Sequence, residues 1–327
     1  MVSRSRGGRL GRALLAASVI GSVAVPVAGA ARPSAVPAPA PAASPFVAAA
    51  TPALLDARYA AGRQAVLDAE RAATGHGDRA RAAKLAAMAA PGRHFLSFDG
   101  RDGGRSVEVF GDLAHARRIA VLVPGTDTGI DTYQRFAADA RALQGRLDAA
   151  GSGAAVVAWL GYRPPAMISL RVLGPAPARR AAPALRGFVG RLASVLPAAR
   201  ITVVCHSYGS LVCAQAADGI RAAAIVLFGS PGTGGTGRPH TTAQLWAGRS
   251  TGDWISGVPH VRLRLPFGTL GLGEDPMSPR FGARLFDAGH GSHAGYLRPG
   301  SPALENIARI VTGATPTAPT TGQARHA

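Results

Sequence analysis

One ten-residue stretch, residues 201–210, constrains the fold more than any other part of the chain. Ile201–Cys205 is rich in β-branched residues and ends abruptly at His206-Ser207-Tyr208-Gly209, and an alanine-rich run follows at once. A buried strand that turns sharply into a helix, with one serine at the apex, is the pattern of a nucleophile elbow. Such a turn lifts the serine hydroxyl clear of the sheet and directs the positive end of the helix at the reaction centre.

Cysteine occupies the position of the usual first glycine in this G-x-S-x-G pattern. Cys205 is small enough to be buried there. The other cysteine, Cys213, lies eight residues further on, and the pair has no metal-binding spacing. An exported chain can oxidise such a pair, but one residue ends a strand and the other lies about a turn and a half into the helix. We therefore expect two free, buried thiols.

The two ends of the chain have compositions that do not support a fold. Four arginines precede an apolar run from Ala13 to Val27, and Ala28-Gly29-Ala30 follows. This pattern predicts a secretory signal peptide (residues 1–30) that is cleaved near Ala30. The alternative is an N-terminal anchor that is retained. Residues 31–52 predict a disordered leader rich in Ala and Pro, and residues 313–327 a disordered tail. Residues 53–312 remain as one domain, secreted or associated with the cell envelope, with no transmembrane span in the mature protein.

The chain is strongly basic, with a formal charge of +18. The four arginines of the signal contribute four of these charges, which leaves +14. A solvated arginine-rich surface explains this charge, and attraction to anionic polymers or lipids of the cell envelope is the alternative. Nucleic acid is not expected as a partner, because the basic residues are scattered and not interleaved with aromatic ones.

The order of periodic segments predicts an α/β fold with a mostly parallel central sheet and helices on both faces. An N-terminal helical segment (52–90) and a hairpin (94–110) come first. Buried strands are expected at 119–123, 154–159, 201–205 and 223–228, with a short one at 244–247; helices are expected at 131–149, 184–196, 211–217 and 302–311.

A serine nucleophile needs a base and an acid, which in this kind of sheet follow it in the order acid, then histidine. Asp253 follows the second strand after Ser207, where the acid belongs, and Asp275 is the alternative. His293 and His290 share a glycine-flanked loop before the last helix, and we favour His293 as base. His206 is expected to point away and pack.

The oxyanion of the reaction would be held by two backbone amides. One is the N–H of the residue after the nucleophile, Tyr208, and the other comes from the loop after the strand at 119–123, at Thr126. The alternative for that loop, Pro124–Gly129, is a plain strand-to-helix turn. A nucleotide site is not expected, because the loop lacks the lysine of a phosphate-binding loop. No cofactor and no metal site are expected.

Two segments bear on the shape of a substrate pocket. The loop from Leu160 to Pro183 is apolar and rich in proline, and could line the pocket or pack as a surface loop. The interval Gly229–Ala243 is mostly Gly, Thr and Pro, too short to bury a core of its own. No large cap domain is therefore expected.

With these residues in place, the chain resembles the α/β-hydrolase superfamily, and more closely an exported actinobacterial branch whose substrates are largely unknown. The matching pieces span roughly residues 55 to 313 and are Val123–Thr126, Ala158–Tyr162, His206–Ser210, Gly229–Gly232, His293 with Tyr296, and Asn306–Gly313. The resemblance implies an α/β-hydrolase fold and a triad of Ser207, Asp253 and His293. Cys205 and Pro124 depart from residues that many relatives carry.

These features predict a secreted serine hydrolase that acts on a small-molecule ester or on an envelope-derived substrate. Two alternatives stay open at this point. One is a non-catalytic envelope-binding protein on a hydrolase scaffold, and the other is a cell-wall amidase or peptidase that uses the same triad.

Overall fold

The computed structural model describes residues 37–40, 49–260, 263–265 and 268–319. The predicted signal peptide (1–30) lies outside these residues, as do most of the predicted leader and the end of the predicted tail. Within the described ranges, no helix is both long enough and apolar enough to cross a membrane.

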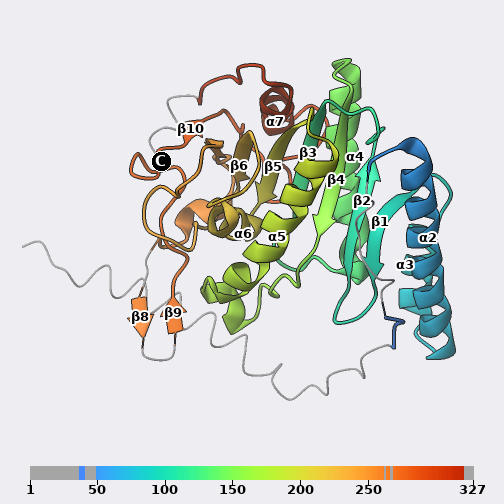
Figure 1. Cartoon of the computed structure of the whole chain (residues 1–327). Helices are drawn as coiled ribbons and strands as arrows, with labels where there is room; N and C mark the ends of the chain where they lie inside the picture. Colours follow the sequence, from blue (N-terminus) through green and yellow to red (C-terminus); the bar gives the residue numbers. More distant parts are fainter. Residues whose placement is uncertain (1–36, 41–48, 261–262, 266–267, 320–327) are drawn as a thin grey trace, which may run out of the picture.

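An eight-stranded sheet forms the centre of the domain (Figure 1). The first three strands, β1, β2 and β4, pair antiparallel, and every other neighbouring pair is parallel. The predicted, mostly parallel sheet is therefore confirmed. In spatial order its strands are β1 (His94–Asp99), β2 (Arg105–Phe110), β4 (Ala154–Leu160), β3 (Arg118–Val123), β5 (Arg200–His206), β6 (Ala224–Phe228), β7 (Gln244–Gly248) and β10 (Arg284–Leu285).

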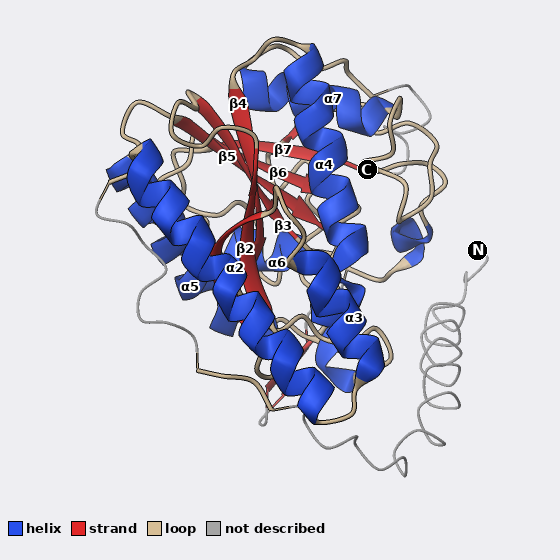
Figure 2. Ribbon diagram, turned by 90° about the vertical axis from the view of Figure 1, so that its right-hand side faces the viewer, coloured by secondary structure: helices blue, strands red, loops and turns tan. Residues whose placement is uncertain are grey.

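Helices cover both faces of this sheet, and Figure 2 shows α5 on one side with α4 and α7 on the other. Side chains that alternate along β3 are buried on opposite faces, Val121 with α5 and α6 and Leu122 with α4 and α7. The continuous apolar runs of the central strands follow from this double burial. The helices are α2 (Pro52–Gly75), α3 (Arg79–Met88), α4 (Tyr133–Ala149), α5 (Ala176–Val195), α6 (Gly209–Ala216) and α7 (Pro302–Thr312), with short 3₁₀ turns η1 (Ile130–Thr132), η2 (Leu170–Leu173) and η3 (Trp254–Gly257).

The last helix, α7, begins and ends at local sequence signals. The Ser301 hydroxyl accepts a hydrogen bond from the Leu304 N–H at 3.2 Å, and Pro302 occupies the first helical position. Gly313 ends the helix in a left-handed conformation, with φ of 81°. A serine cap of this kind stabilises a helix by about 1 kcal/mol, and glycine adopts the left-handed end without steric cost.

The start of α5 was predicted eight residues too late. The sequence places a helix at 184–196 because Pro183 normally ends or precedes a helix, whereas α5 begins at Ala176 and contains Pro183. Ala178, Ala181 and Ala182 are buried against the sheet, so packing outweighs the hydrogen bond that proline cannot make.

Three short strands and part of the tail also differ from expectation. The β8 (Leu263–Leu265) and β9 (Gly268–Leu270) hairpin and β10 were not predicted, because two or three residues carry no readable period. At the C-terminus, Thr317 exchanges hydrogen bonds with Asn306 on α7, so the ordered chain continues beyond the predicted boundary at residue 313.

The direction in which strands are added to the sheet reverses at β3. The connection after β3 leads to β4 on one side, and the next leads to β5 on the opposite side of β3. In open α/β sheets, ligands bind at the carboxyl ends of the strands at such a reversal. Residues 229–243, between β6 and β7, contain no helix or strand, so no cap domain covers this edge from that interval.

Candidate active site

Ser207 occupies the sharp turn between β5 and α6. Its φ is 52°, in the left-handed region, and its N–H donates to the Phe228 carbonyl at 3.0 Å. Two glycines make room for the turn. A side chain at Gly209 would lie 2.6 Å from the Pro124 carbonyl oxygen, and one at Gly125 would lie 2.7 Å from the Ser207 Cβ. The elbow predicted from the sequence is therefore present, and its glycine is required by the close approach of the end of β3.

His293 and Asp253 complete a chain of polar contacts that begins at Ser207. His293 Nε2 lies 2.9 Å from Ser207 Oγ, and His293 Nδ1 lies 2.9 Å from both carboxylate oxygens of Asp253. Because a carboxylate only accepts, Nδ1 carries the proton and Nε2 is left to accept from the serine hydroxyl. This order of groups can remove a proton from Ser207.

Asp253 is buried and is held as a carboxylate by hydrogen bonds. Its Oδ1 accepts from the Ile255 N–H at 2.9 Å, and its Oδ2 accepts from the Tyr296 hydroxyl at 2.7 Å. Burial alone would raise the pKa of Asp253, but the hydrogen bonds from His293, Tyr296 and Ile255 outweigh it and lower that pKa below its ordinary value. The acid therefore stays ionised beside the imidazole.

Tyr296 links the loop that carries the acid to the loop that carries the histidine. Its hydroxyl donates to Asp253 and accepts from the Ser250 N–H at 3.0 Å. Gly229, at the end of β6, has φ of +55°, and a side chain there would lie 2.9 Å from the Tyr296 ring. The phenol thus reaches Asp253 because the residue that follows β6 is glycine.

His206 packs beside the site instead of pointing away from it. Its ring stacks on Phe228 with 5.0 Å between centroids, and its Nε2–H donates to the His293 carbonyl at 2.9 Å. Burial, with a further contribution from His293, lowers the pKa of His206 to about 4. The predicted packing role holds, but this neutral imidazole also fixes the backbone of the His293 loop.

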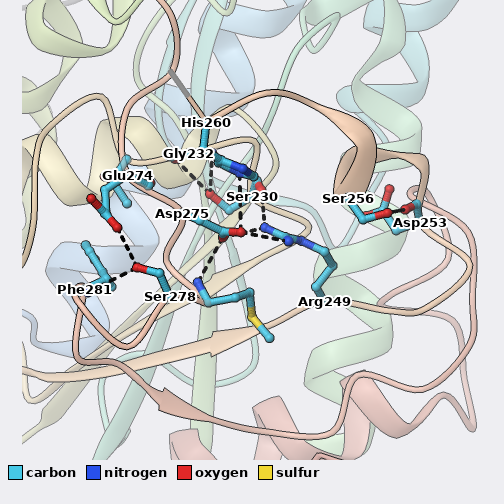
Figure 3. Close-up of polar contacts among 12 residues, drawn as sticks. Ser230, Gly232, Arg249, Asp253, Ser256, His260, Glu274, Asp275, Ser278 and Phe281 are labelled. Carbon is cyan, nitrogen blue, oxygen red and sulfur yellow. Dashed lines mark hydrogen bonds and ion pairs between the residues drawn. The ribbon is translucent and has the colours of Figure 1, made fainter. Parts of the chain in front are cut away.

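The alternative histidine and the alternative acid are both engaged elsewhere. His290 Nδ1 lies 2.6 Å from the Thr251 hydroxyl on the surface. Asp275 accepts two hydrogen bonds from Arg249, at 2.5 and 3.0 Å, and His260 lies 3.6 Å from it (Figure 3). Arg249 also donates to the Ser230 carbonyl at 3.3 Å. This partly buried ion pair ties the ends of β6 and β7 to the 275 loop and leaves Asp253 to face His293.

The amides of Tyr208 and Thr126 face no acceptor within the part of the chain that is described. Neither N–H donates to a backbone or side-chain atom there, whereas the next amide, Asp127, donates to the Pro165 carbonyl at 3.3 Å. Tyr208 follows the nucleophile, and Thr126 follows Gly125, which packs on Ser207. Two unpaired amides at this point can stabilise a negative oxygen.

The expectation of free thiols was wrong, because Cys205 and Cys213 form a disulfide. The sharp elbow folds α6 back beside its own strand, which brings the two Cα atoms to 6.5 Å. That separation lies within the range that a disulfide spans. The bond therefore ties the strand before Ser207 to the helix after it.

A cavity of about 320 Å³ opens onto Ser207. Trp254 lies at its rim, with its ring 5.1 Å from that of His293 and 55% of its surface exposed. From the loop predicted to line the pocket, only Met167 contributes to this cavity. Asp139 and Arg135 on α4 line it too, and burial raises the pKa of Asp139 to about 6. In the described ranges, no three His, Cys, Asp or Glu side chains group as metal ligands.

Comparison with known proteins assigns the family. A family model described as alpha/beta hydrolase matches residues 99–263, just over half of the chain. The chain belongs to the alpha/beta hydrolase family. The matched segment includes Ser207 and Asp253, and His293 of the hydrolase lies beyond it. No curated protein matches the sequence.

Solved structures similar to this hydrolase include three that cover about two thirds of it. An alpha/beta serine hydrolase without a lid from Xanthomonas campestris is 15% identical, with 68% of this chain and 94% of that one covered and a TM-score of 0.40. An alpha-beta serine hydrolase homologue from Coxiella burnetii is 9% identical, with 68% of this chain and 96% of that one covered and a TM-score of 0.41. S-formylglutathione hydrolase from Staphylococcus aureus is 10% identical, with 67% of this chain and 96% of that one covered and a TM-score of 0.38. At these identities and TM-scores, the similarity to these structures does not indicate a substrate.

Three parts of the site of the hydrolase have no clear sequence signal. Tyr296 is among the pieces that resemble the α/β-hydrolase superfamily, but that resemblance did not give its role. Ser250 and Arg249 act through contacts with residues more than 25 positions away, Tyr296 and Asp275. Such pairings depend on how loops meet at the sheet edge, which no local pattern encodes.

Proposed function

We propose that the protein is a secreted serine hydrolase that cleaves carboxylic esters. The proposal rests on one observation above all, the unbroken contact from Ser207 Oγ through His293 to the carboxylate of Asp253. The two unpaired amides beside Ser207 and the cavity that opens onto it supply the rest of an acyl-transfer site.

In the proposed reaction, Ser207 Oγ attacks the ester carbonyl carbon while His293 Nε2 takes the hydroxyl proton. The Tyr208 and Thr126 amides hold the carbonyl oxygen as it becomes negative. His293 then gives its proton to the leaving alcohol oxygen, and an acyl-serine ester remains. Water attacks that ester with the same base, which releases the acid and restores Ser207. Asp253 fixes the imidazole tautomer throughout.

Export is part of the proposal and has two supports. The arginine-rich start, the apolar run and the Ala28-Gly29-Ala30 site have the pattern of a signal peptide. The Cys205–Cys213 disulfide is a bond that persists in oxidising compartments and is rare in the cytosol.

Turnover of p-nitrophenyl esters by the mature protein tests the proposed roles. Ser207→Ala and His293→Ala should each lower kcat by about 10⁶-fold, and Asp253→Asn by about 10⁴-fold. His290→Ala is the matched control and should stay within about twofold of the wild type. Loss of activity in His290→Ala with retention in His293→Ala would overturn the choice of base. Turnover of amides but not esters would favour the amidase alternative.

A further inference from the structure

A second, larger hollow adjoins the catalytic cavity. Its volume is about 770 Å³, and it lies between the loop after β3, the segment 161–171 and the start of α5. Asp127, Thr128 and Thr132 line both hollows, so the two lie against the same loop, the one that carries Thr126. A substrate bound at Ser207 that passes over this loop would reach the second space.

Three arginines line this hollow, which we call the arginine groove: Arg163, Arg171 and Arg180. All three are exposed, and none makes an ion pair or a side-chain hydrogen bond within the described residues. Arg105, also in the groove, is neutralised by Asp99 at 3.1 Å. The groove therefore presents three uncompensated guanidinium groups.

The carboxylates of the groove do not cancel this charge. Asp131 forms an ion pair with Arg81 at 3.1 Å. Asp127 accepts a hydrogen bond from the Met167 N–H at 3.0 Å and is the one remaining acid among the groove residues. Three cations against one carboxylate leave the groove positive.

The start of α5 contributes to this positive potential. Arg180 lies near the N-terminus of α5, whose first turn has no acidic residue and no side-chain cap. Cations at the positive end of a helix are unfavourable. A local arrangement that opposes the helix dipole, with no compensating contact, is typical of a functional site.

We propose that the arginine groove binds an anionic group, phosphate or carboxylate, carried by the ester that reacts at Ser207. Guanidinium groups bind such oxyanions through paired, charge-assisted hydrogen bonds. The inference rests on the proposed ester hydrolysis and deepens it, because it names the substrate class as anionic esters.

Matched esters test the groove. Within a set, the esters share the acyl group and the spacer and differ only in the group that ends the spacer, a methyl, a carboxylate or a phosphate. The spacer length differs from one set to the next. We expect kcat/KM for the best anionic ester to exceed that of its methyl counterpart by at least about tenfold at low salt, and the difference to shrink in 1 M NaCl. The carboxylate and phosphate arms show which oxyanion the groove prefers.

Arginine variants assign the effect to the groove. Arg163→Gln, Arg171→Gln and Arg180→Gln should each lower kcat/KM for the anionic ester by about threefold to tenfold and leave the methyl ester unchanged. Arg117→Gln is the control, since Arg117 is exposed and precedes β3 at the opposite edge of the sheet. The proposed role of the groove would be contradicted by equal kcat/KM for anionic and methyl esters, or by an effect of Arg117→Gln as large as that of the groove variants. Either result would leave the proposed ester hydrolysis unaffected.

A binding measurement separates the groove from the chemistry. Ser207→Ala is titrated calorimetrically with the anionic and the methyl ester, which requires no turnover. Tighter binding of the anionic ester, lost in the triple arginine variant, supports the groove even if no ester is hydrolysed. Equal dissociation constants contradict it.

Discussion

At Ser207, the backbone adopts a conformation that residues other than glycine rarely take, and its neighbours hold it there. The left-handed φ of 52° costs on the order of 1 kcal/mol, so surrounding contacts must stabilise it. The hydrogen bond from the Ser207 N–H to Phe228 and the disulfide beside it supply such contacts. Strain at this residue is the means by which the hydroxyl is presented to His293.

Tyr296 is a positioning residue at the same scale, and Tyr296→Phe tests it. Loss of the phenol removes one charge-assisted hydrogen bond from Asp253, so kcat should fall about tenfold with KM little changed. The hydrogen bond from Tyr296 helps to lower the pKa of Asp253, so that pKa should rise in the variant. The acidic limb of the kcat/KM profile should therefore move to higher pH.

Tyr133→Phe is the matched control for this variant. Tyr133 is a buried tyrosine whose hydroxyl donates to the Glu108 carboxylate at 2.9 Å, away from Ser207. Both variants should lose stability, but the control should keep the pH profile of the wild type. If the pH dependence of kcat/KM in Tyr296→Phe equals that of the wild type, Tyr296 has only a structural role.

The sequence was sufficient to select Ser207, Asp253 and His293 as candidates because their order and spacing are tied to strand ends. Asp253 follows β7 and His293 precedes α7, so the topology limits the choice to a few residues. The role of Tyr296 and the change in environment of His206 were missed. Both depend on distances between loops, which the linear order of residues does not contain.

At the scale of elements, the disulfide clamps β5 to α6 across the elbow. The cysteines are eight positions apart, and cross-linking so short a loop stabilises a fold by about 2–3 kcal/mol in the chain-entropy model. Because both side chains are fully buried, reductant should reach them only when the chain opens.

Cys205→Ala combined with Cys213→Ala should lower the melting temperature by at least about 5 °C, because both the cross-link and two buried side chains are lost. Mass analysis after alkylation of the unfolded, unreduced wild type should find no free thiol. Two alkylated cysteines under those conditions would contradict the disulfide. An unchanged melting temperature would show that the clamp does not stabilise the elbow.

Most helices and strands of the hydrolase could be predicted because each long element has a clear hydrophobic period and defined ends. The N-terminal helical segment (52–90), the hairpin and α7 match their predicted outer bounds within one or two residues, aided by signals such as Ser301 and Gly313. The start of α5 was missed because packing of its alanines overrides Pro183. The two-residue strand β10 is placed by its pairing with β7, which its own sequence does not indicate.

For the whole molecule, a site that residues 229–243 do not cover with a cap domain limits how much of an acyl chain can be buried. Each CH₂ group buried contributes about 0.8 kcal/mol, but the cavity at Ser207 is about 320 Å³ and polar side chains form part of its wall. We therefore expect kcat/KM for p-nitrophenyl esters to rise over short acyl chains and then level off.

The same panel should show no jump in rate above the micelle concentration of a neutral ester. A steep rise out to long acyl chains, or such a jump, would indicate a mobile lid and a true lipase.

Stoichiometric labelling with a fluorophosphonate tests most directly whether Ser207 is an activated nucleophile. The wild type should incorporate one equivalent, found by peptide mass analysis on Ser207, and His290→Ala should label at the same rate. Ser207→Ala should not label, and His293→Ala should label at least about 10³-fold more slowly, because the hydroxyl has lost its base. A folded wild-type protein that takes up no probe, or takes it up at another residue, would contradict a catalytic Ser207 and favour a binding protein on a hydrolase scaffold.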